Sequence, residues 1–198
     1  ARCETVISVV RDVPESMALL FDSQAILSGN ARPSTVVLSS TLSPKAVLEI
    51  ARRAGDGIVM VDAPMSGAPY RAREGTLTFM VGGAGAAVTK LLPAFEAMGK
   101  DVHHLGPLGA GAAGKVSNNL CAAAGVVAVR HALAAAETYG IDRAALLAVM
   151  RTSSGNTWYG ENLERIDWAR EGYDPKNTMG ILEKDVMSFL DAVADDDT

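Results

Sequence analysis

The stretch Gly106-Pro-Leu-Gly-Ala-Gly-Ala-Ala-Gly-Lys-Val-Ser-Asn-Asn119 decides the architecture of this chain. Its glycines are typical of a turn, since glycine adopts backbone conformations that other residues avoid. The apolar, alanine-rich sequence after them predicts one long helix, which extends to about Tyr139 and ends before Gly140. The chain is therefore expected to change character at this turn.

One lysine and two amides lie on the first turns of the predicted helix. Asn118 and Asn119 follow Lys115 by three and four residues, a spacing that puts the three side chains on one helix face. Two interpretations are open. The three groups can be a solvated helix start whose amides form local hydrogen bonds, or Lys115 can transfer a proton while a neighbouring amide orients it.

Upstream of the turn, short apolar runs alternate with helical patterns. Strands are predicted at residues 6–10, 35–39, 58–62, 76–81 and 102–105. Helices are predicted at residues 14–21, 44–54 and 86–98, and Pro93 is expected to bend or interrupt the last of them. This alternation favours an α/β fold with a parallel-rich sheet.

Downstream of the turn, no further strand is predicted. Helical patterns cover residues 142–151, 157–170 and 178–194, in addition to the long helix. The fold class is therefore α/β followed by all-α, with the long helix joining the two regions.

Composition narrows the possible functions. The 198 residues are 48% hydrophobic and 21% charged, which is typical of a globular protein, and the net charge of −5 argues against nucleic acid as the main partner. Cys3 and Cys121 have neither metal-ligand nor disulfide spacing, which favours a reducing, cytoplasmic setting. No uninterrupted apolar run reaches membrane-spanning length and no signal-peptide pattern is present, so no membrane partner is expected.

Polar residues follow two of the predicted strands. Ser66 and Gly67 lie in the loop after the strand at 58–62, and Ser40 and Thr41 follow the strand at 35–39. This edge of an open α/β sheet is where ligands bind, and a hydroxyl beside a glycine can hold a small anion. An ordinary turn and a helix cap are the alternative interpretations. Further along, Lys184-Asp185 is interpreted as a solvated pair.

The three histidines, His103, His104 and His131, lack a cysteine or carboxylate at metal-ligand spacing. They are interpreted as structural, and no metal site is predicted.

Five motifs follow one another along nearly the whole chain. They are Asp62-Ala-Pro-Met-Ser-Gly67, Gly75-Thr-Leu-Thr-Phe-Met-Val-Gly-Gly83, Gly106-Pro-Leu-Gly-Ala-Gly111, Lys115-Val-Ser-Asn-Asn119 and Lys184-Asp185. In this order they resemble the β-hydroxyacid dehydrogenase family, which includes 3-hydroxyisobutyrate dehydrogenase and relatives that act on threonate or tartronate semialdehyde. The resemblance implies that residues 1–108 are the C-terminal part of a Rossmann-type NAD(P)-binding domain. Residues 109–198 would be an incomplete all-α domain for substrate binding and dimerisation.

The resemblance also implies catalytic and substrate-binding roles. Lys115 matches the catalytic lysine, the general acid/base for hydride transfer between NAD(P) and a small β-hydroxy acid. Asn119 matches the amide that orients the substrate. Ser66, Gly67 and Ala68 match the loop that holds the substrate carboxylate.

Four further positions match contacts to the cofactor, NAD or NADP: Val10, Arg11, Thr41 and Lys184. Two site positions depart from the family pattern. Arg11 stands where the family usually has a proline, and Ala68 stands where it usually has a second glycine, which is expected to narrow the carboxylate pocket.

The family begins with a βαβ unit that carries a Gly-x-Gly-x-x-Gly fingerprint. Gly109-Ala-Gly111 leads into a helix but is not expected to complete that pattern with the required strand and downstream acid, so it is assigned to the lysine motif. The chain is thus expected to be a fragment that lacks this unit and the last C-terminal helices, and that is inactive by itself. The alternative is a truncated, non-catalytic relative that serves as an oligomerisation or interaction module. A 6-phosphogluconate-type enzyme would need a set of basic residues around a phosphate, and none is identified.

The segment from Leu120 to Ala136 predicts an assembly. It carries a single charged side chain, Arg130, and is apolar nearly all round the helix. The helical region offers little to cover it. A second subunit is therefore expected to bury part of this helix, giving a homodimer or a higher homo-oligomer.

Overall fold

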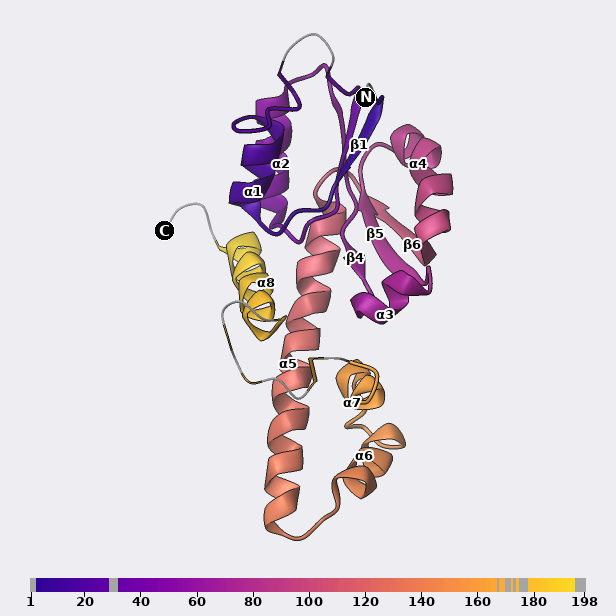
Figure 1. The fold of residues 1–198 in the computed structure, drawn as a ribbon, viewed down its shortest axis with the longest axis vertical. Helices are drawn as coiled ribbons and strands as arrows, with labels where there is room; N and C mark the ends of the chain where they lie inside the picture. The colour runs from indigo at the N-terminus through magenta and orange to yellow at the C-terminus, as the bar shows by residue number, and fades with distance from the viewer. Residues whose placement is uncertain are drawn as a thin grey trace. The chain divides into compact units, whose positions relative to one another are not determined.

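The computed structural model describes residues 3–28, 32–166, 168–169, 172, 174 and 178–194 (Figure 1). The chain divides into two compact units, residues 1–117 with 187–198 and residues 118–186. The boundary falls inside helix α5 (Ala110–Thr138), so this single helix contributes to both units.

The first unit is built on a sheet that has six strands within the described residues. β1, β2 and β3 are parallel neighbours, whereas β5 pairs antiparallel with β3 and β4 and parallel with β6. The predicted parallel-rich α/β sheet is confirmed, and the two antiparallel pairings make it a mixed sheet. The strand bounds are β1 (Thr5–Ser8), β2 (Thr35–Leu38), β3 (Val59–Asp62), β4 (Met65–Ser66), β5 (Leu77–Gly82) and β6 (Gly99–Gly106).

Helices cover both faces of this sheet, because its central strands are apolar on both sides. Val36 of β2 packs in one core cluster with residues of α1 (Val13–Leu20) and α2 (Pro44–Ala54). The next residue, Val37, faces the other way and packs with α4 (Gly85–Met98). Figure 1 shows α1 and α2 on one side of the strands and α4 on the other.

Short polar side chains set two of the helix starts. Asp12 caps α1 by accepting a hydrogen bond from the Glu15 N–H at 2.9 Å, and Ser43 caps α2 by accepting one from the Ala46 N–H at 3.2 Å. α4 continues through Pro93, so the alternative of an interrupted helix is wrong. The apolar face that α4 buries against the sheet outweighs the hydrogen bond that the proline removes.

The loop expected at residues 63–69 has regular structure of its own. It contains the short strand β4 and leads into α3 (Ala68–Arg73). A two-residue strand is too short to show a periodic pattern, and Pro69 lies in the first helical turn, where proline is tolerated.

The second unit is helical. Besides part of α5 it contains α6 (Arg143–Arg151), α7 (Trp158–Asn162) and the beginning of α8 (Thr178–Val193). Its core is an apolar cluster contributed by α5, α6, α7 and the segment after α7, with Val126, Val129, Leu133, Leu147, Tyr159, Leu163, Ile166, Trp168 and Ala169 buried. The predicted change from α/β to all-α is confirmed.

The helix predicted over residues 157–170 is too long. α7 ends at Asn162 and residues 163–165 form a turn, while residues 167 and 170 lie outside the described residues. The Tyr159 hydroxyl donates a hydrogen bond to the carbonyl oxygen of Ala169 at 2.7 Å, and both residues are buried. Packing of this segment onto its own helix therefore overrides the local helical pattern.

α5 is long and apolar enough to cross a membrane by length and composition, although Lys115, Arg130 and Glu137 interrupt its apolar sequence. Its 18-residue window has a mean hydropathy of 1.4, and the core helices of soluble proteins pass the same test. Within the chain, 28% of that window is buried. Among the described residues, most of this window is therefore not buried.

Candidate active site

Lys115 lies in the second turn of α5 and is buried. Its exposure is 8%, and Ala112 and Val116 beside it on the helix are 1% exposed. A solvated helix start would leave the lysine in water, so that interpretation of Lys115 is wrong. An ammonium group that is shielded from bulk water is unusual outside functional or tightly paired positions.

The turn before Lys115 is held by a carboxylate from the sheet. Asp62, the last residue of β3, is 0% exposed. Its Oδ1 accepts a hydrogen bond from the Gly109 N–H at 2.8 Å, and its Oδ2 accepts one from the Ala112 N–H at 2.6 Å. Burial raises the pKa of Asp62 above its usual value, and the backbone hydrogen bonds from Gly109 and Ala112 oppose that rise.

Two glycines allow α5 to approach the sheet this closely. A Cβ on Gly82 would lie 2.4 Å from Asp62 Oδ1, and a Cβ on Gly111 would lie 2.4 Å from the Met80 carbonyl oxygen. Both distances are far below van der Waals contact. The glycines of the motifs at residues 75–83 and 106–111 therefore serve close packing of strand, turn and helix.

The sequence from Gly109 to Gly114 spells Gly-x-Gly-x-x-Gly, and it does lie between a strand and a helix, β6 and α5. The strand is the one predicted at residues 102–105, but no strand follows α5 within the described residues, so the βαβ unit of the fingerprint is not completed. What distinguishes it from a dinucleotide fingerprint is that Asp62 already occupies its amides. A buried carboxylate stands where a bound phosphate would otherwise be.

Asn119 lies one helical turn beyond Lys115 on α5 and is 7% exposed. Its side-chain Nδ2 donates a hydrogen bond to Asp185 Oδ2 at 2.5 Å. Its Oδ1 accepts one from Asn118 Nδ2 at 3.2 Å. These two partners fix which end of the amide is nitrogen and leave one N–H of Asn119 for another acceptor.

The Lys184-Asp185 pair is not the solvated pair expected from the sequence. Asp185 is 4% exposed, and Lys184 Nζ forms an ion pair with Asp185 Oδ1 at 2.8 Å. Asp185 therefore contacts both Asn119 and Lys184. The contact between Asp185 and Asn119 was missed because these residues are distant in sequence, although Lys184-Asp185, as the last of the five motifs, was a signal.

The loop expected to hold a carboxylate has a constrained backbone. Gly67 has φ +148°, and a Cβ there would lie 2.8 Å from the Cβ of Arg71. Ala68 has φ +58°, the left-handed region that favours glycine. Ser66 is half-buried and pairs with Thr78 of β5. The departure from a second glycine thus places an alanine in a strained conformation.

Three of the four expected cofactor contacts lie at the carboxyl ends of β1 and β2. The Val10 N–H donates a hydrogen bond to Ser40 Oγ at 3.1 Å, which ties the two strand ends together, and Thr41 next to it is half-buried. The Arg11 N–H donates to Glu15 Oε2 at 2.8 Å in the first turn of α1. The fourth, Lys184, lies on α8 in the second unit.

This edge has hydrogen-bonding capacity that its own residues leave unused. The hydroxyls of Ser8 and Ser39, at the ends of β1 and β2, are buried without a hydrogen-bond partner among the described residues. Buried hydroxyls without a partner are rare in proteins.

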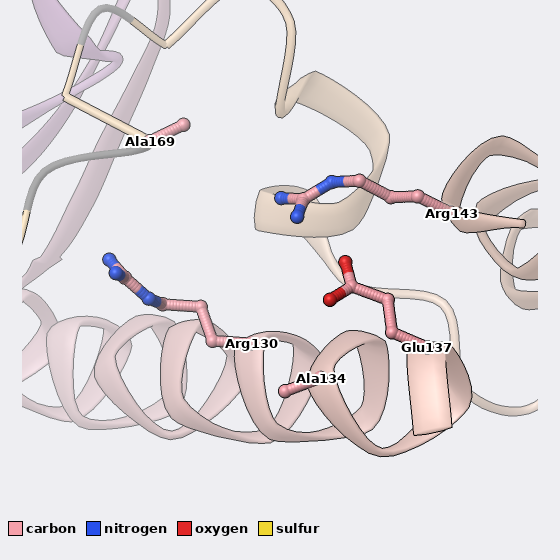
Figure 2. Close-up of a pocket in the computed structure, with 5 residues that line it drawn as sticks. All are labelled: Arg130, Ala134, Glu137, Arg143 and Ala169. Atoms are coloured by element: carbon pink, nitrogen blue, oxygen red, sulfur yellow. The ribbon is translucent and has the colours of Figure 1, made fainter. Parts of the chain in front are cut away.

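A pocket of about 310 Å³ lies in the second unit, and none of the predicted site residues is among the described residues that line it (Figure 2). Arg143 and Glu137 extend toward it from α6 and from the end of α5. Its lining residues are Arg130, Ala134, Glu137, Arg143 and Ala169. Within the described part of the chain, no group of three or more histidine, cysteine or acidic residues could hold a metal ion.

Two family models match the chain in succession. Residues 1–106 match the NAD binding domain of 6-phosphogluconate dehydrogenase, and residues 109–197 match the NAD-binding segment of NADP-dependent 3-hydroxyisobutyrate dehydrogenase. The junction between the two matches falls at the turn before α5.

Individual relatives agree with this assignment. The chain is 40% identical over 157 residues to an NAD-dependent L-serine dehydrogenase of Pseudomonas aeruginosa, covering 78% of this chain and 52% of the relative. It is 32% identical over 194 residues to an L-threonate dehydrogenase of Cupriavidus necator, covering 96% of this chain and 65% of the relative. The chain thus spans between half and two thirds of the length of these relatives.

A solved structure shows the same fold. The crystal structure of 3-hydroxyisobutyrate dehydrogenase from Salmonella typhimurium matches with a TM-score of 0.79 at 30% sequence identity. The match covers 95% of this chain and 66% of the solved one.

Proposed function

The chain belongs to the β-hydroxyacid dehydrogenase family, and from this premise we propose that it serves an NAD(P)-dependent oxidoreductase that acts on a small β-hydroxy acid. The observation that carries the proposal is the buried lysine on α5, Lys115, one turn before the buried amide of Asn119. L-Serine, L-threonate and 3-hydroxyisobutyrate are the substrates to test first, because they are the substrates in the names of its relatives.

Lys115 would hold and move the proton. Oxidation of a carbinol to a carbonyl releases the hydroxyl proton, and the reverse reaction needs it back, so one lysine near the hydroxyl can act in both directions. When bound, the nicotinamide supplies the acceptor for the hydride that leaves the carbinol carbon. The burial of Lys115 supports this role, since exclusion of bulk water keeps the proton between enzyme and substrate.

Asn119 would orient the substrate. One N–H of its amide remains after the hydrogen bonds to Asp185 and from Asn118, and a substrate oxygen can accept it. Asp185 would keep that N–H in place. The same carboxylate pairs with Lys184, whose proposed contact is to the cofactor.

The loop of Ser66, Gly67 and Ala68 would bind the substrate carboxylate. Ser66 offers a hydroxyl, and Gly67 has no side chain of its own, so its backbone N–H can approach an anion. At the neighbouring edge, Val10, Arg11 and Thr41 would contact the nicotinamide end of NAD(P).

The proposal is tested by an activity assay on the full-length protein. Candidate hydroxy acids should be offered with NAD and with NADP while reduced cofactor is followed by absorbance. We expect turnover with at least one β-hydroxy acid and none with the matching compound that lacks the hydroxyl. Tight, specific binding of another protein without any turnover would favour the alternative, a non-catalytic interaction module.

We also propose that a second copy covers part of α5 in the assembled protein. Val127 is 55% exposed on this helix, and 28% of its apolar window is buried within the chain. Light scattering of the full-length protein should give the mass of a dimer or a larger homo-oligomer. A compact monomer at micromolar concentration would contradict it. The cytoplasmic location expected from the cysteine pattern stays a prediction.

A further inference from the structure

Resting on the proposed function, we infer that Asp62 is a positioning residue. Its carboxylate fills the cluster of backbone amides at the start of α5 and thereby holds Lys115 at a fixed height and rotation relative to the end of β3.

The contacts involve both oxygens of one fully buried side chain. Oδ1 accepts the Gly109 N–H at 2.8 Å and Oδ2 accepts the Ala112 N–H at 2.6 Å. These donors lie on either side of the helix start and are three residues apart. A bidentate contact of this kind restrains both the position and the rotation of the helix end, whereas a single bond would leave it free to pivot.

The surroundings leave no room for another arrangement. Gly82 lies against the carboxylate so closely that a Cβ there would come within 2.4 Å of Oδ1 and 2.7 Å of the Gly111 nitrogen. A Cβ on Gly111 would lie 2.9 Å from Oδ2. Gly82 and Gly111 thus pack directly against the carboxylate, and a larger residue at either position would displace it.

The consequence for Lys115 follows from helix geometry. Lys115 is three residues after Ala112, which is about 4.5 Å along the helix axis. Backbone within the first turns of a helix is stiff, so a shift at Ala112 reaches the Cα of Lys115 almost undiminished. A displacement of about 1 Å in a proton-transferring group is enough to lower turnover by up to about 100-fold.

The test uses the full-length protein with Asp62→Asn. Asparagine keeps the shape but replaces one acceptor oxygen by an NH₂ group that faces a backbone N–H. The matched control is Asp142→Asn, which changes the N-cap of α6, where Oδ1 accepts the Ala145 N–H at 3.0 Å on the protein surface. Three readouts are compared: hydrogen exchange at the Gly109 and Ala112 amides, the rate at which an amine-selective reagent modifies Lys115, and kcat beside the Kd of NAD(P)H.

We expect Asp62→Asn to speed exchange at both amides by about tenfold or more, and to change the modification rate of Lys115 severalfold. We expect kcat to fall by about 10- to 100-fold, with the Kd of NAD(P)H unchanged within about twofold. Asp142→Asn should leave all of these unaltered. Unchanged exchange and an unchanged Lys115 rate in Asp62→Asn would overturn the inference.

Two further outcomes are decisive. If the unmodified protein has no dehydrogenase activity, the proposed function fails, but exchange and Lys115 modification still decide the positioning role. If Asp62→Asn does not fold, exchange in the unmodified protein answers the question. The Gly109 and Ala112 amides should then be among the slowest in residues 109–138, and fast exchange there would contradict the anchor.

Discussion

Two glycine turns of the first unit use their backbone amides in opposite ways. At Gly109, the closed turn, the amides around the start of α5 are taken by the buried carboxylate of Asp62. At Gly67, the open turn, the start of α3 has no side-chain cap among the described residues. The comparison teaches that a glycine pattern does not by itself make an anion site. Whether a ligand can use the amides depends on whether the protein already supplies the anion.

The closed turn is expected to serve chemistry through the helix that it anchors. Lys115→Ala in the full-length protein should lower turnover at least about 100-fold, the usual scale for one acid–base group. The Kd of NAD(P)H should change little. Steady-state kinetics and fluorescence titration measure the two, and Lys90→Ala, an exposed lysine on α4, is the control. Near-normal turnover in Lys115→Ala would remove this lysine from the reaction.

The open turn is expected to serve recognition of a carboxylate. Ser66→Ala should lower kcat/KM for the best hydroxy acid by about 5- to 150-fold, which corresponds to about 1–3 kcal/mol for a buried charge left without one partner. The matching amide substrate should be poor with both proteins and nearly indifferent to the change. Equal efficiency of acid and amide with the unmodified protein would show that this loop does not bind the carboxylate.

Backbone strain separates the two turns further. Gly109 has φ +93°, and a Cβ there would meet its nearest neighbour, the Cβ of Pro44, at an ordinary 3.7 Å. Gly109→Ala should therefore destabilise the protein by about 1–2 kcal/mol through backbone strain alone. Chemical denaturation measures it, with Gly85→Ala in α4 as a control that has open space and no positive φ. A loss no larger than in the control would mean that the turn relaxes.

Replacing alanine by glycine is expected to stabilise the protein at the open turn. Ala68 already has φ +58°, so Ala68→Gly should raise the free energy of unfolding by about 0.5–1 kcal/mol, after the greater entropy of glycine in the unfolded chain is subtracted. The same denaturation experiment measures it. If the substitution destabilises the protein, the left-handed conformation of Ala68 is not strained as proposed.

The smallest effect concerns pH. Burial raises the pKa of Asp62 in the folded protein, so the folded state binds its proton more tightly than the unfolded state does. The stabilisation linked to that proton is present below the unfolded pKa of about 3.9 and is lost as the pH rises through the raised folded pKa. As the pH rises through this window, the free energy of unfolding of the unmodified protein should therefore fall relative to that of Asp62→Asn, whose amide does not titrate. A shift in the other direction would show that the amide hydrogen bonds outweigh desolvation.

Local patterns in the sequence determined most of the elements. The strands and the helices of the first unit follow from apolar runs, capping residues and glycines that act within a few positions, and α2 at Pro44–Ala54 has the predicted bounds. The order of the motifs also singled out Lys115, Asn119 and Ser66. These signals are readable because helix periodicity, caps and motif spacing are properties of neighbouring residues.

Tertiary structure alone decided which of these residues meet. Asp62 contacts amides 47 and 50 positions away, and Asn119 contacts Asp185 across 66 positions. The same holds for the early end of α7, where Tyr159 binds the carbonyl oxygen of Ala169. No local period encodes such pairs, because a hydrogen bond between distant segments forms only after both are packed and buried, where leaving either group unpaired would cost free energy.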